Sequence, residues 1–237
     1  MTIFTGKAVV VTGAGTGIGR ATARAFAAQG ASVLAVGRTA ATLAETAADH
    51  PRTRTLTGDV TDAHRVVDAA VAEFGRIDVL VNNAAVRSGD SMAVTNLFAP
   101  ARLVEAALPH LKQSRGVVVN VSTAIGQRGW PLPGGELYAA LKSALDSLTR
   151  SWAVQYAPHG VRVVAVAPGP IATPMHEHRD RGPEEAAALR DALVAHVPLG
   201  RVGQPEEVAF WVVQLARPEA AYTTGVVLPV DGGALVG

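Results

Sequence analysis

The chain has 237 residues, 49% of them hydrophobic, which suits a single domain over residues 1–237 with a sizeable core. It contains no cysteine, which excludes disulfides, thiolate metal ligands and thiol catalysis. A formal net charge of +1 gives no field that favours nucleic acid or an anionic membrane. No apolar run approaches the roughly 20 residues of a membrane span, and no signal peptide is recognisable, so a cytoplasmic protein is expected.

Short β-branched runs alternate with alanine-rich stretches along the chain. Strands are predicted at residues 8–12, 32–36, 54–57, 79–81, 117–121, 162–167 and 226–229. Most of these runs are apolar without alternation, which is typical of strands buried on both faces of a parallel sheet. Helices are predicted at residues 18–29, 39–49, 62–74, 92–111, 137–156, 184–196 and 206–215. The alternation predicts a single-domain, Rossmann-type α/β fold, in which a doubly wound parallel sheet of about seven strands has helices on both faces.

Local signals predict where several helices begin and end. Gly30 is expected just past the end of the first helix, and Thr61 is expected to cap the start of the helix at residues 62–74. The segment at about 170–197 begins with a run rich in proline, histidine and charge, and it predicts a mobile substrate loop. His176 and His178 lie in that loop, but the sequence offers no third ligand, so no metal site is predicted.

Four glycines follow the first predicted strand, in TGAGTGIGR at residues 12–20. Their spacing is T-G-x-x-x-G-x-G and not the G-x-G-x-x-G of the dinucleotide fingerprint. Glycines at this point permit a tight turn and let a pyrophosphate approach backbone N–H groups at a helix N-terminus. The alternative is a flexible turn without a ligand. The place between a strand and a helix favours nucleotide binding.

The end of the second predicted strand indicates which dinucleotide binds. An enzyme that uses NAD is expected to carry an acidic residue there, which accepts a hydrogen bond from the ribose 2′-hydroxyl. Here Gly37 stands in that place, Arg38 follows, and no acid occurs before Glu45. A guanidinium at this point suits a 2′-phosphate, so NADP(H) is predicted in preference to NAD(H). The alternative is that Arg38 is a solvated residue at the start of the next helix.

Tyr138 and Lys142 lie four residues apart in ELYAALK, hence on one face of a predicted helix. A free tyrosine has a pKa near 10, so acid–base work near neutrality requires it to fall by about 2–3 units. An adjacent ammonium favours the phenolate and supplies such a shift. A pair at this spacing is weak evidence by itself. It gains weight from the glycine-rich turn upstream and from the scarcity of lysine in the chain.

With these motifs together, the sequence resembles the short-chain dehydrogenase/reductase family, in its 3-oxoacyl-reductase-like branch. The resemblance covers nearly the whole chain, and it is the order of the motifs that makes it specific. They are TGAGTGIG (12–19), DV (59–60), NNAA (82–85), TNL (95–97), NVSTAIG (120–126), YAALK (138–142), APGPIATPM (167–175), PLGRVGQPEEVA (198–209) and TTGVVLPVDGG (223–233).

The resemblance implies a role for each matched residue. Tyr138 would be the general acid that protonates a carbonyl oxygen as hydride arrives, and Lys142 would lower its pKa and hold the nicotinamide ribose. Asn96 would kink its helix and position a water in a proton relay; it could instead be an ordinary polar residue. The implied cofactor-binding residues are Gly13, Thr16, Gly17, Ile18, Gly19, Gly37, Arg38, Asp59, Val60, Asn83, Ala84, Ala85, Tyr138, Lys142, Pro168, Gly169, Ile171 and Thr173.

Besides Arg38, two of these residues have structural alternatives. Asp59 could help to cap the following helix, and Thr173 could stabilise its own turn. The neighbouring hydroxyls of Ser122 and Thr123 point to opposite faces of a strand, so only one of them can face the site. The family's catalytic serine stands three residues before a glycine, here Gly126, so the resemblance implies Thr123 as the catalytic hydroxyl and turns Ser122 away.

Several stretches depart from the family pattern. Ala85 replaces the glycine of NNAG, and Val164 stands where the family often has asparagine. The connection from Asn83 to Asn96 is too short for an additional helix that normally shields the site, so a wider pocket, or one completed by a partner subunit, is expected. The loop before Tyr138 is expanded. An apolar, bulky substrate is expected in a pocket lined by Val86, Thr123, Trp130 and Met175; Trp130 could instead only pack against its own loop.

The leading hypothesis is an NADPH-dependent reductase of a ketone or aldehyde, with the reverse oxidation of a secondary alcohol possible. One alternative is a non-redox reaction on the same scaffold, such as dehydration or epimerisation. Another is a regulatory protein that binds NADP without chemistry. The expected partner is a small carbonyl or alcohol, with no nucleic acid and no membrane. The resemblance implies a homotetramer, or a homodimer, assembled through the helices that carry Asn96 and Tyr138 and through the C-terminal segment.

Overall fold

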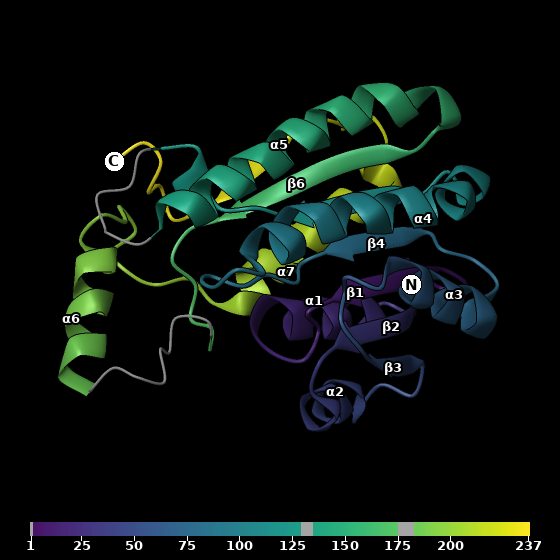
Figure 1. Ribbon diagram of the computed structural model, residues 1–237, viewed down its shortest axis with the longest axis horizontal. Helices are drawn as coiled ribbons and strands as arrows, with labels where there is room; N and C mark the ends of the chain where they lie inside the picture. The colour runs from purple at the N-terminus through teal and green to yellow at the C-terminus, as the bar shows by residue number, and fades with distance from the viewer. Residues whose placement is uncertain (1, 129–134, 175–182) are drawn as a thin grey trace.

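The computed structural model describes residues 2–128, 135–174 and 183–237. Seven strands are present in the described part, and each alternates with helical structure (Figure 1). The strands are β1 (Ala8–Thr12), β2 (Ser32–Gly37), β3 (Thr53–Thr57), β4 (Val79–Asn82), β5 (Val117–Val121), β6 (Arg162–Pro168) and β7 (Val227–Val230). The α-helices are α1 (Gly17–Ala28), α2 (Ala40–Ala47), α3 (Ala63–Phe74), α4 (Ala99–Ser114), α5 (Glu136–Tyr156), α6 (Pro183–Val194) and α7 (Pro205–Ala216). Short helical turns are η1 (Val94–Phe98, a π-helix), η2 (Ala124–Gly126), η3 (Ala157–His159) and η4 (Pro218–Ala220).

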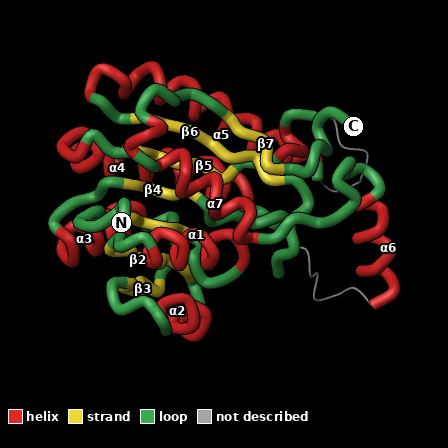
Figure 2. Tube along the Cα trace, turned by 180° about the vertical axis from the view of Figure 1, so that it is seen from behind, coloured by secondary structure: helices red, strands yellow, loops and turns green. Residues whose placement is uncertain are grey.

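The strands form one parallel sheet in the order β3-β2-β1-β4-β5-β6-β7, which confirms the predicted doubly wound fold. Helices α3, α4 and α5 cover one face, and Figure 2 shows α1 and α7 from the other side. Each face has its own core, because the strands are buried on both sides. Phe26, Leu43 and Val212 pack on the α1, α2 and α7 face, and Leu103 and Leu145 pack on the α3, α4 and α5 face.

The strand order reverses between β1 and β4, so the loops that leave their carboxyl ends diverge there. In open α/β sheets this is the point at which a ligand binds. Helix α6 stands at the same end of the sheet, away from the two helical layers (Figure 1). The sheet thereby places the loops after β1, β4, β5 and β6 around one region of the molecule.

The observed helix ends agree with most of the local predictions. Gly30 follows the last residues of α1 with φ +91°, and Gly75 ends α3 with φ +71°, which are left-handed conformations that suit glycine. The prediction that Thr61 caps α3 is wrong. Asp62 is the cap, and its carboxylate accepts a hydrogen bond from the backbone N–H of Arg65. A carboxylate is the better acceptor at the positive end of a helix.

Candidate active site

A cavity of about 920 Å³ lies at the carboxyl ends of β1, β4, β5 and β6, where the strand order reverses. Its lining includes every described residue that the sequence assigned to catalysis or the cofactor, with the exception of Asn96. Asn96 is fully buried behind the loop that follows β4. The fold therefore brings residues that are up to 160 positions apart in the sequence, from Gly13 to Thr173, onto one continuous surface.

The glycine-rich turn between β1 and α1 has no room for side chains. A Cβ on Gly19 would lie 2.1 Å from the carbonyl oxygen of Gly13, and a Cβ on Gly13 would lie 2.8 Å from the Cα of Ala84. Gly13 and Gly17 also adopt left-handed φ values of +64° and +50°. A close turn that exposes backbone N–H groups at the start of a helix is what a pyrophosphate requires. The turn thus fits the phosphates of a dinucleotide.

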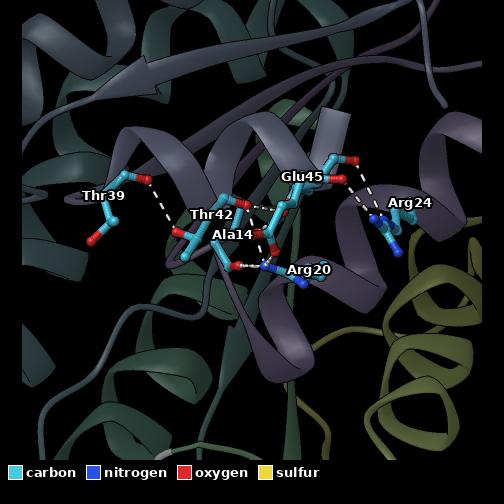
Figure 3. Close-up of polar contacts among 8 residues, drawn as sticks. Ala14, Arg20, Arg24, Thr39, Thr42 and Glu45 are labelled. Carbon is cyan, nitrogen blue, oxygen red and sulfur yellow. Dashed lines mark hydrogen bonds and ion pairs between the residues drawn. The ribbon is translucent and has the colours of Figure 1, made fainter. Parts of the chain in front are cut away.

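Arg20, the residue directly after the last glycine of the motif, holds this turn in place. Its guanidinium donates to the carbonyl oxygen of Gly15, from Nε at 2.9 Å, and forms an ion pair of 2.7 Å with Glu45 of α2 (Figure 3). Arg24, one turn further along α1, donates to the carbonyl oxygen of Glu45 at 2.6 Å. The hydroxyl of Thr46 donates to the carbonyl oxygen of Ala14 at 2.9 Å. These contacts join α1, α2 and the turn, and they occupy Glu45 away from the cavity.

Arg38 and Asp59 lie together at the outer end of the cavity. Arg38 is exposed and follows the last residue of β2. Hydrogen bonds from Thr61, and the positive charge of Arg38, hold the pKa of Asp59 below its usual range. One of these hydrogen bonds comes from the backbone N–H of Thr61, at 2.9 Å, so one carboxylate oxygen of Asp59 stabilises the loop before α3. Asp59 therefore lies where it could contact a cofactor, and it also stabilises its own loop.

Thr12 and Asn83 join the ends of β1 and β4 at the reversal point. The Thr12 hydroxyl accepts from the backbone N–H groups of Asn83 and Ala84, at 3.0 and 3.1 Å, and donates to the carbonyl oxygen of Val81. The Asn83 amide donates to the carbonyl oxygens of Thr12 and Gly13, at 2.8 and 3.2 Å. The Asn83 side chain therefore acts on the glycine turn itself, and Thr12 is a site-building residue that the sequence reasoning missed.

Tyr138 lies in the first turn of α5, half-buried, with two cations near its ring. The Lys142 ammonium nitrogen is 5.9 Å from the ring centroid, and the guanidinium carbon of Arg87 is 5.7 Å from it. Burial raises the pKa of Tyr138, and the charge of Arg87 opposes that rise. The predicted fall of this pKa beside Lys142 is therefore wrong for this structure, because burial of the phenol outweighs the nearby positive charge. The spacing of four residues thus places the lysine beside the phenol, as predicted, and the second cation comes from the loop after β4.

Lys142 is buried, and its ammonium donates a hydrogen bond of 2.6 Å to the carbonyl oxygen of Val121 at the end of β5. Burial lowers the pKa of Lys142 to about 8, and the charge of Asp146, one turn further along α5, works against that shift. Burial raises the pKa of Asp146, while hydrogen bonds from Ser122 and Gln127 act in the opposite direction. Lys142 is therefore a buried cation at neutral pH, and its pKa of about 8 lies only slightly above that pH.

The two neighbouring hydroxyls after β5 have different surroundings. Ser122 is buried against α5, where its hydroxyl lies 3.4 Å from the carbonyl oxygen of Lys142. Thr123 is half-buried, and its hydroxyl lies 3.5 Å from the carbonyl oxygen of Pro168, at the limit of a hydrogen bond. Backbone alternation along the strand separates the two directions. Thr123 is therefore the less buried of the two, but both residues line the cavity, so the expectation that Ser122 turns away from the site is not met.

Asn96 lies in the π-helical turn η1, which is the local kink expected at this position. Its side-chain amide forms two hydrogen bonds with the backbone of Val86: the Oδ1 atom accepts from the N–H at 2.9 Å, and Nδ2 donates to the carbonyl oxygen at 2.7 Å. The amide thereby closes the loop after β4 onto η1. Residues 83–91 contain no helix, which agrees with the expectation that the short connection omits one.

Comparison with known proteins gives the context for this geometry. Residues 13–234 match the family described as enoyl-(acyl carrier protein) reductase. A 3-oxoacyl-[acyl-carrier-protein] reductase of Thermotoga maritima is 38% identical, over 98% of this chain and 98% of its own length. The chain belongs to the short-chain dehydrogenase/reductase family. A meso-2,3-butanediol dehydrogenase of Serratia marcescens is 35% identical, over 98% of this chain and 95% of its own length.

A solved short-chain dehydrogenase/reductase of unknown function from Caenorhabditis elegans, crystallised with cofactor, superposes with a TM-score of 0.90 at 31% identity. The superposition covers 98% of this chain and 96% of that one. As a member of the short-chain dehydrogenase/reductase family, the protein is an oxidoreductase that acts on a carbonyl or alcohol group of a small molecule and binds a nicotinamide cofactor. No helix in the described part of the chain is long and apolar enough to cross a membrane.

The substrate end of this short-chain dehydrogenase/reductase site is described in part. Val86 and Thr123 line the cavity, together with Ile125, Leu193 and Leu235. The other two residues expected in the substrate pocket, Trp130 and Met175, lie outside the described residues, as do His176 and His178. Ile171 is buried and pairs with Gly203, and Thr173 packs beside Gly17. Helix α6 confirms the helix predicted at 184–196, and it occupies part of the segment at about 170–197 predicted as a mobile substrate loop.

Proposed function

We propose that the protein is an NADP(H)-dependent reductase of ketones or aldehydes, which also catalyses the reverse oxidation of the secondary alcohol. The observation that carries the proposal is the position of Tyr138: it is half-buried on the wall of the cavity that begins at the glycine turn, with Lys142 beside its ring. The relatives include reductases and dehydrogenases, which supports this type of chemistry.

Two features of the cavity suit a dinucleotide. The glycines leave space for it at the turn, and Arg38 and Asp59 provide polar groups farther along the cavity. Backbone N–H groups at Thr16, Gly17 and Ile18 would hold the pyrophosphate, and Lys142 would hold the nicotinamide ribose. Pro168, Gly169 and the segment that follows would lie along the nicotinamide. The bound nicotinamide supplies a hydride to a carbonyl carbon, or accepts one from an alcohol.

Tyr138 donates the proton that the carbonyl oxygen requires in the reduction. A phenol whose pKa burial has raised is protonated at neutral pH, so it holds the proton that the reduction consumes, although the raised pKa by itself makes it a weaker acid. Lys142 and Arg87 stabilise the phenolate that remains after proton transfer, because both place positive charge beside the ring. The hydroxyl of Thr123 orients the carbonyl oxygen toward the phenol, and Asn96 with its backbone carbonyl supports the water that returns a proton through Lys142.

The proposed preference for NADP(H) rests on three residues. Arg38 lies exposed at the outer end of the cavity, where a 2′-phosphate would be. Gly37 leaves no carboxylate at the end of β2 to repel that phosphate, and Glu45 is engaged by Arg20. A charge-assisted hydrogen bond contributes about 1.5–3 kcal/mol, which corresponds to a preference of about one to two orders of magnitude.

We also propose that the protein assembles as a homotetramer. Large apolar side chains are exposed on two separate parts of the surface: Leu137 and Val154 on α5 with Phe98 at the end of η1, and Phe210 and Trp211 on α7. Large apolar surface that is exposed on a soluble protein marks interaction sites. Light scattering should give the mass of four chains, and a monomeric mass would contradict the proposal.

The test of the proposed function is the variant Tyr138→Phe, measured against a panel of ketones and aldehydes by NADPH consumption. The wild type should consume NADPH with at least one carbonyl. The variant should bind NADPH with the same dissociation constant and lose turnover by at least about a hundredfold, because general acid catalysis contributes about 10²–10⁴. Turnover that the variant retains at the wild-type rate would refute the role of Tyr138.

A further inference from the structure

Arg87 lines the cavity beside Tyr138. It comes five residues after the last residue of β4, in the shortened connection to η1. Its guanidinium carbon is 5.7 Å from the centroid of the Tyr138 ring, and both residues line the cavity. A cation in this position is within the reach of any substrate whose carbonyl contacts the phenol.

The position of Arg87 is fixed by its neighbour in the chain. Both backbone polar groups of Val86 are bound by the buried side chain of Asn96, at 2.9 and 2.7 Å. Because the peptide that leads to Arg87 is held in this way, the start of its side chain is fixed relative to η1 and α5. A preorganised cation loses little freedom on binding a ligand, which makes it effective in recognition.

Most of the charged residues that line the cavity are cations, Arg87, Arg128 and Lys142 among them. Among the described residues that line the whole cavity, Asp59 is the single carboxylate, and it lies near Arg38 at the outer end. Arg128 donates from Nη1 to the carbonyl oxygens of Ala234 and Gly237, so it holds the C-terminal segment against the cavity. Val86, Ile125 and Leu193 supply apolar surface beside the charges.

On the strength of the proposed function, we infer that Arg87 binds a carboxylate of the substrate, and that the substrate class is a 2-oxo or 3-oxo acid with an apolar body. In these acids the carboxylate is one or two carbons from the carbonyl carbon, so a carbonyl oxygen that accepts a hydrogen bond from Tyr138 brings the carboxylate beside the guanidinium. Arginine suits this task, since its planar fork matches a carboxylate with two parallel hydrogen bonds.

The reaction then balances as the reduction of an oxo acid to a hydroxy acid. A C–H bond forms at the carbonyl carbon from the hydride of NADPH, and the C=O π bond opens. The oxygen takes the phenolic proton of Tyr138, and Tyr138 recovers a proton from solvent. The products are NADP⁺ and the hydroxy acid, and the carboxylate remains bound to Arg87 and chemically unchanged throughout.

The test compares 2-oxo-4-phenylbutanoate with its neutral ethyl ester in the wild type, Arg87→Gln and Arg87→Lys. Arg54→Gln is the control, because Arg54 pairs with Glu73 on the exposed surface at the edge of the sheet. In Arg87→Gln, kcat/KM for the acid should fall by about 10- to 100-fold, as for the loss of a charge-assisted hydrogen bond. The ester should lose less than the acid, because for the ester only the charge beside Tyr138 is removed, so the ratio of kcat/KM for acid to ester should fall by at least about fivefold. Arg87→Lys should restore part of the activity on the acid.

Two outcomes would overturn the inference. One is an equal loss on acid and ester in Arg87→Gln, which would assign Arg87 to Tyr138 or to folding; the other is a wild type that reduces the ester in preference to the acid. A failure of the proposed function looks different, since neither compound would then be reduced. Binding is therefore measured as well: the Tyr138→Phe protein with NADPH should bind 2-oxo-4-phenylbutanoate, and the added change Arg87→Gln should weaken that binding by at least tenfold. Unchanged binding would refute the inference without any turnover.

Discussion

Lys142 gives a prediction that connects the stability of the fold with its chemistry. Burial lowers its pKa from the usual 10.5 to about 8, so between these values the unfolded chain holds a proton that the folded protein has released. The free energy of unfolding therefore rises with pH across this interval. Each unit of difference in pKa corresponds to about 1.36 kcal/mol, so the buried ammonium costs about 3 kcal/mol of stability at pH 7.

The perturbation is Lys142→Met, which keeps the volume of the side chain and removes the charge. The free energy of unfolding of wild type and variant is measured in urea at pH 7 and at pH 9.5. From pH 7 to pH 9.5, the free energy of unfolding should rise by about 2 kcal/mol more in the wild type than in the variant, because only the wild type carries the titrating amine. The lost hydrogen bond to Val121 is absent at both pH values and cancels in the comparison.

A matched control is Lys112→Met, which changes a partly exposed lysine near the end of α4. It should leave the pH dependence of stability as in the wild type. The reasoning would be refuted if wild type and Lys142→Met gained the same stability between the two pH values. Such a result would mean that the Lys142 amine is as well solvated in the folded protein as in the unfolded chain. Water would then screen the interaction of its charge with Tyr138.

Three further predictions concern the site. Gly19→Ala should abolish NADPH binding, since its Cβ would lie 2.1 Å from the Gly13 carbonyl oxygen, whereas Gly135→Ala, with its nearest contact at 3.8 Å, should bind normally in the same fluorescence titration. Arg38→Glu should weaken NADPH binding by at least tenfold relative to NADH, and an unchanged ratio of dissociation constants would contradict the cofactor assignment. Thr123→Ala should lower kcat/KM far more than Ser122→Ala; the opposite order would mean that the catalytic hydroxyl is assigned one residue too late.

Much of the fold could be predicted because the signals are local. The apolar β-branched runs at 8–12 and 117–121 match β1 and β5 to the residue. Strands β2, β3, β4 and β6 are each one residue longer than predicted, and β7 is shifted by one residue. Strand ends are set by pairing with a neighbour, as for Asn82 opposite Asn120 and Pro168 opposite Val230. The choice between Thr61 and Asp62 as the cap of α3 depends on backbone angles that the sequence does not determine.

The parts of the site that escaped prediction are contacts between distant residues. Thr12 and Asn83 are 71 positions apart, and the pairing of β1 with β4 brings them together. Their hydrogen bonds join the glycine turn to the end of β4, which the sequence alone does not reveal. The motif placed Asn96 in the site, but its bonds to Val86 depend on the path of the shortened loop. Arg87 likewise has no motif, and its approach to Tyr138 follows from that path. A cation near the end of β4 in a shortened connection is the signal that could have suggested it.

In the proposed reaction, hydride passes from the nicotinamide to a carbonyl carbon while Tyr138 supplies the proton. The most direct measurement is the reduction of a ketone by the wild type with NADPH that carries deuterium at both C4 positions, with the alcohol analysed by mass spectrometry. The alcohol should carry one deuterium on the former carbonyl carbon, and Tyr138→Phe should form at least about a hundredfold less of it. An alcohol without carbon-bound deuterium, or equal formation by the variant, would contradict the mechanism.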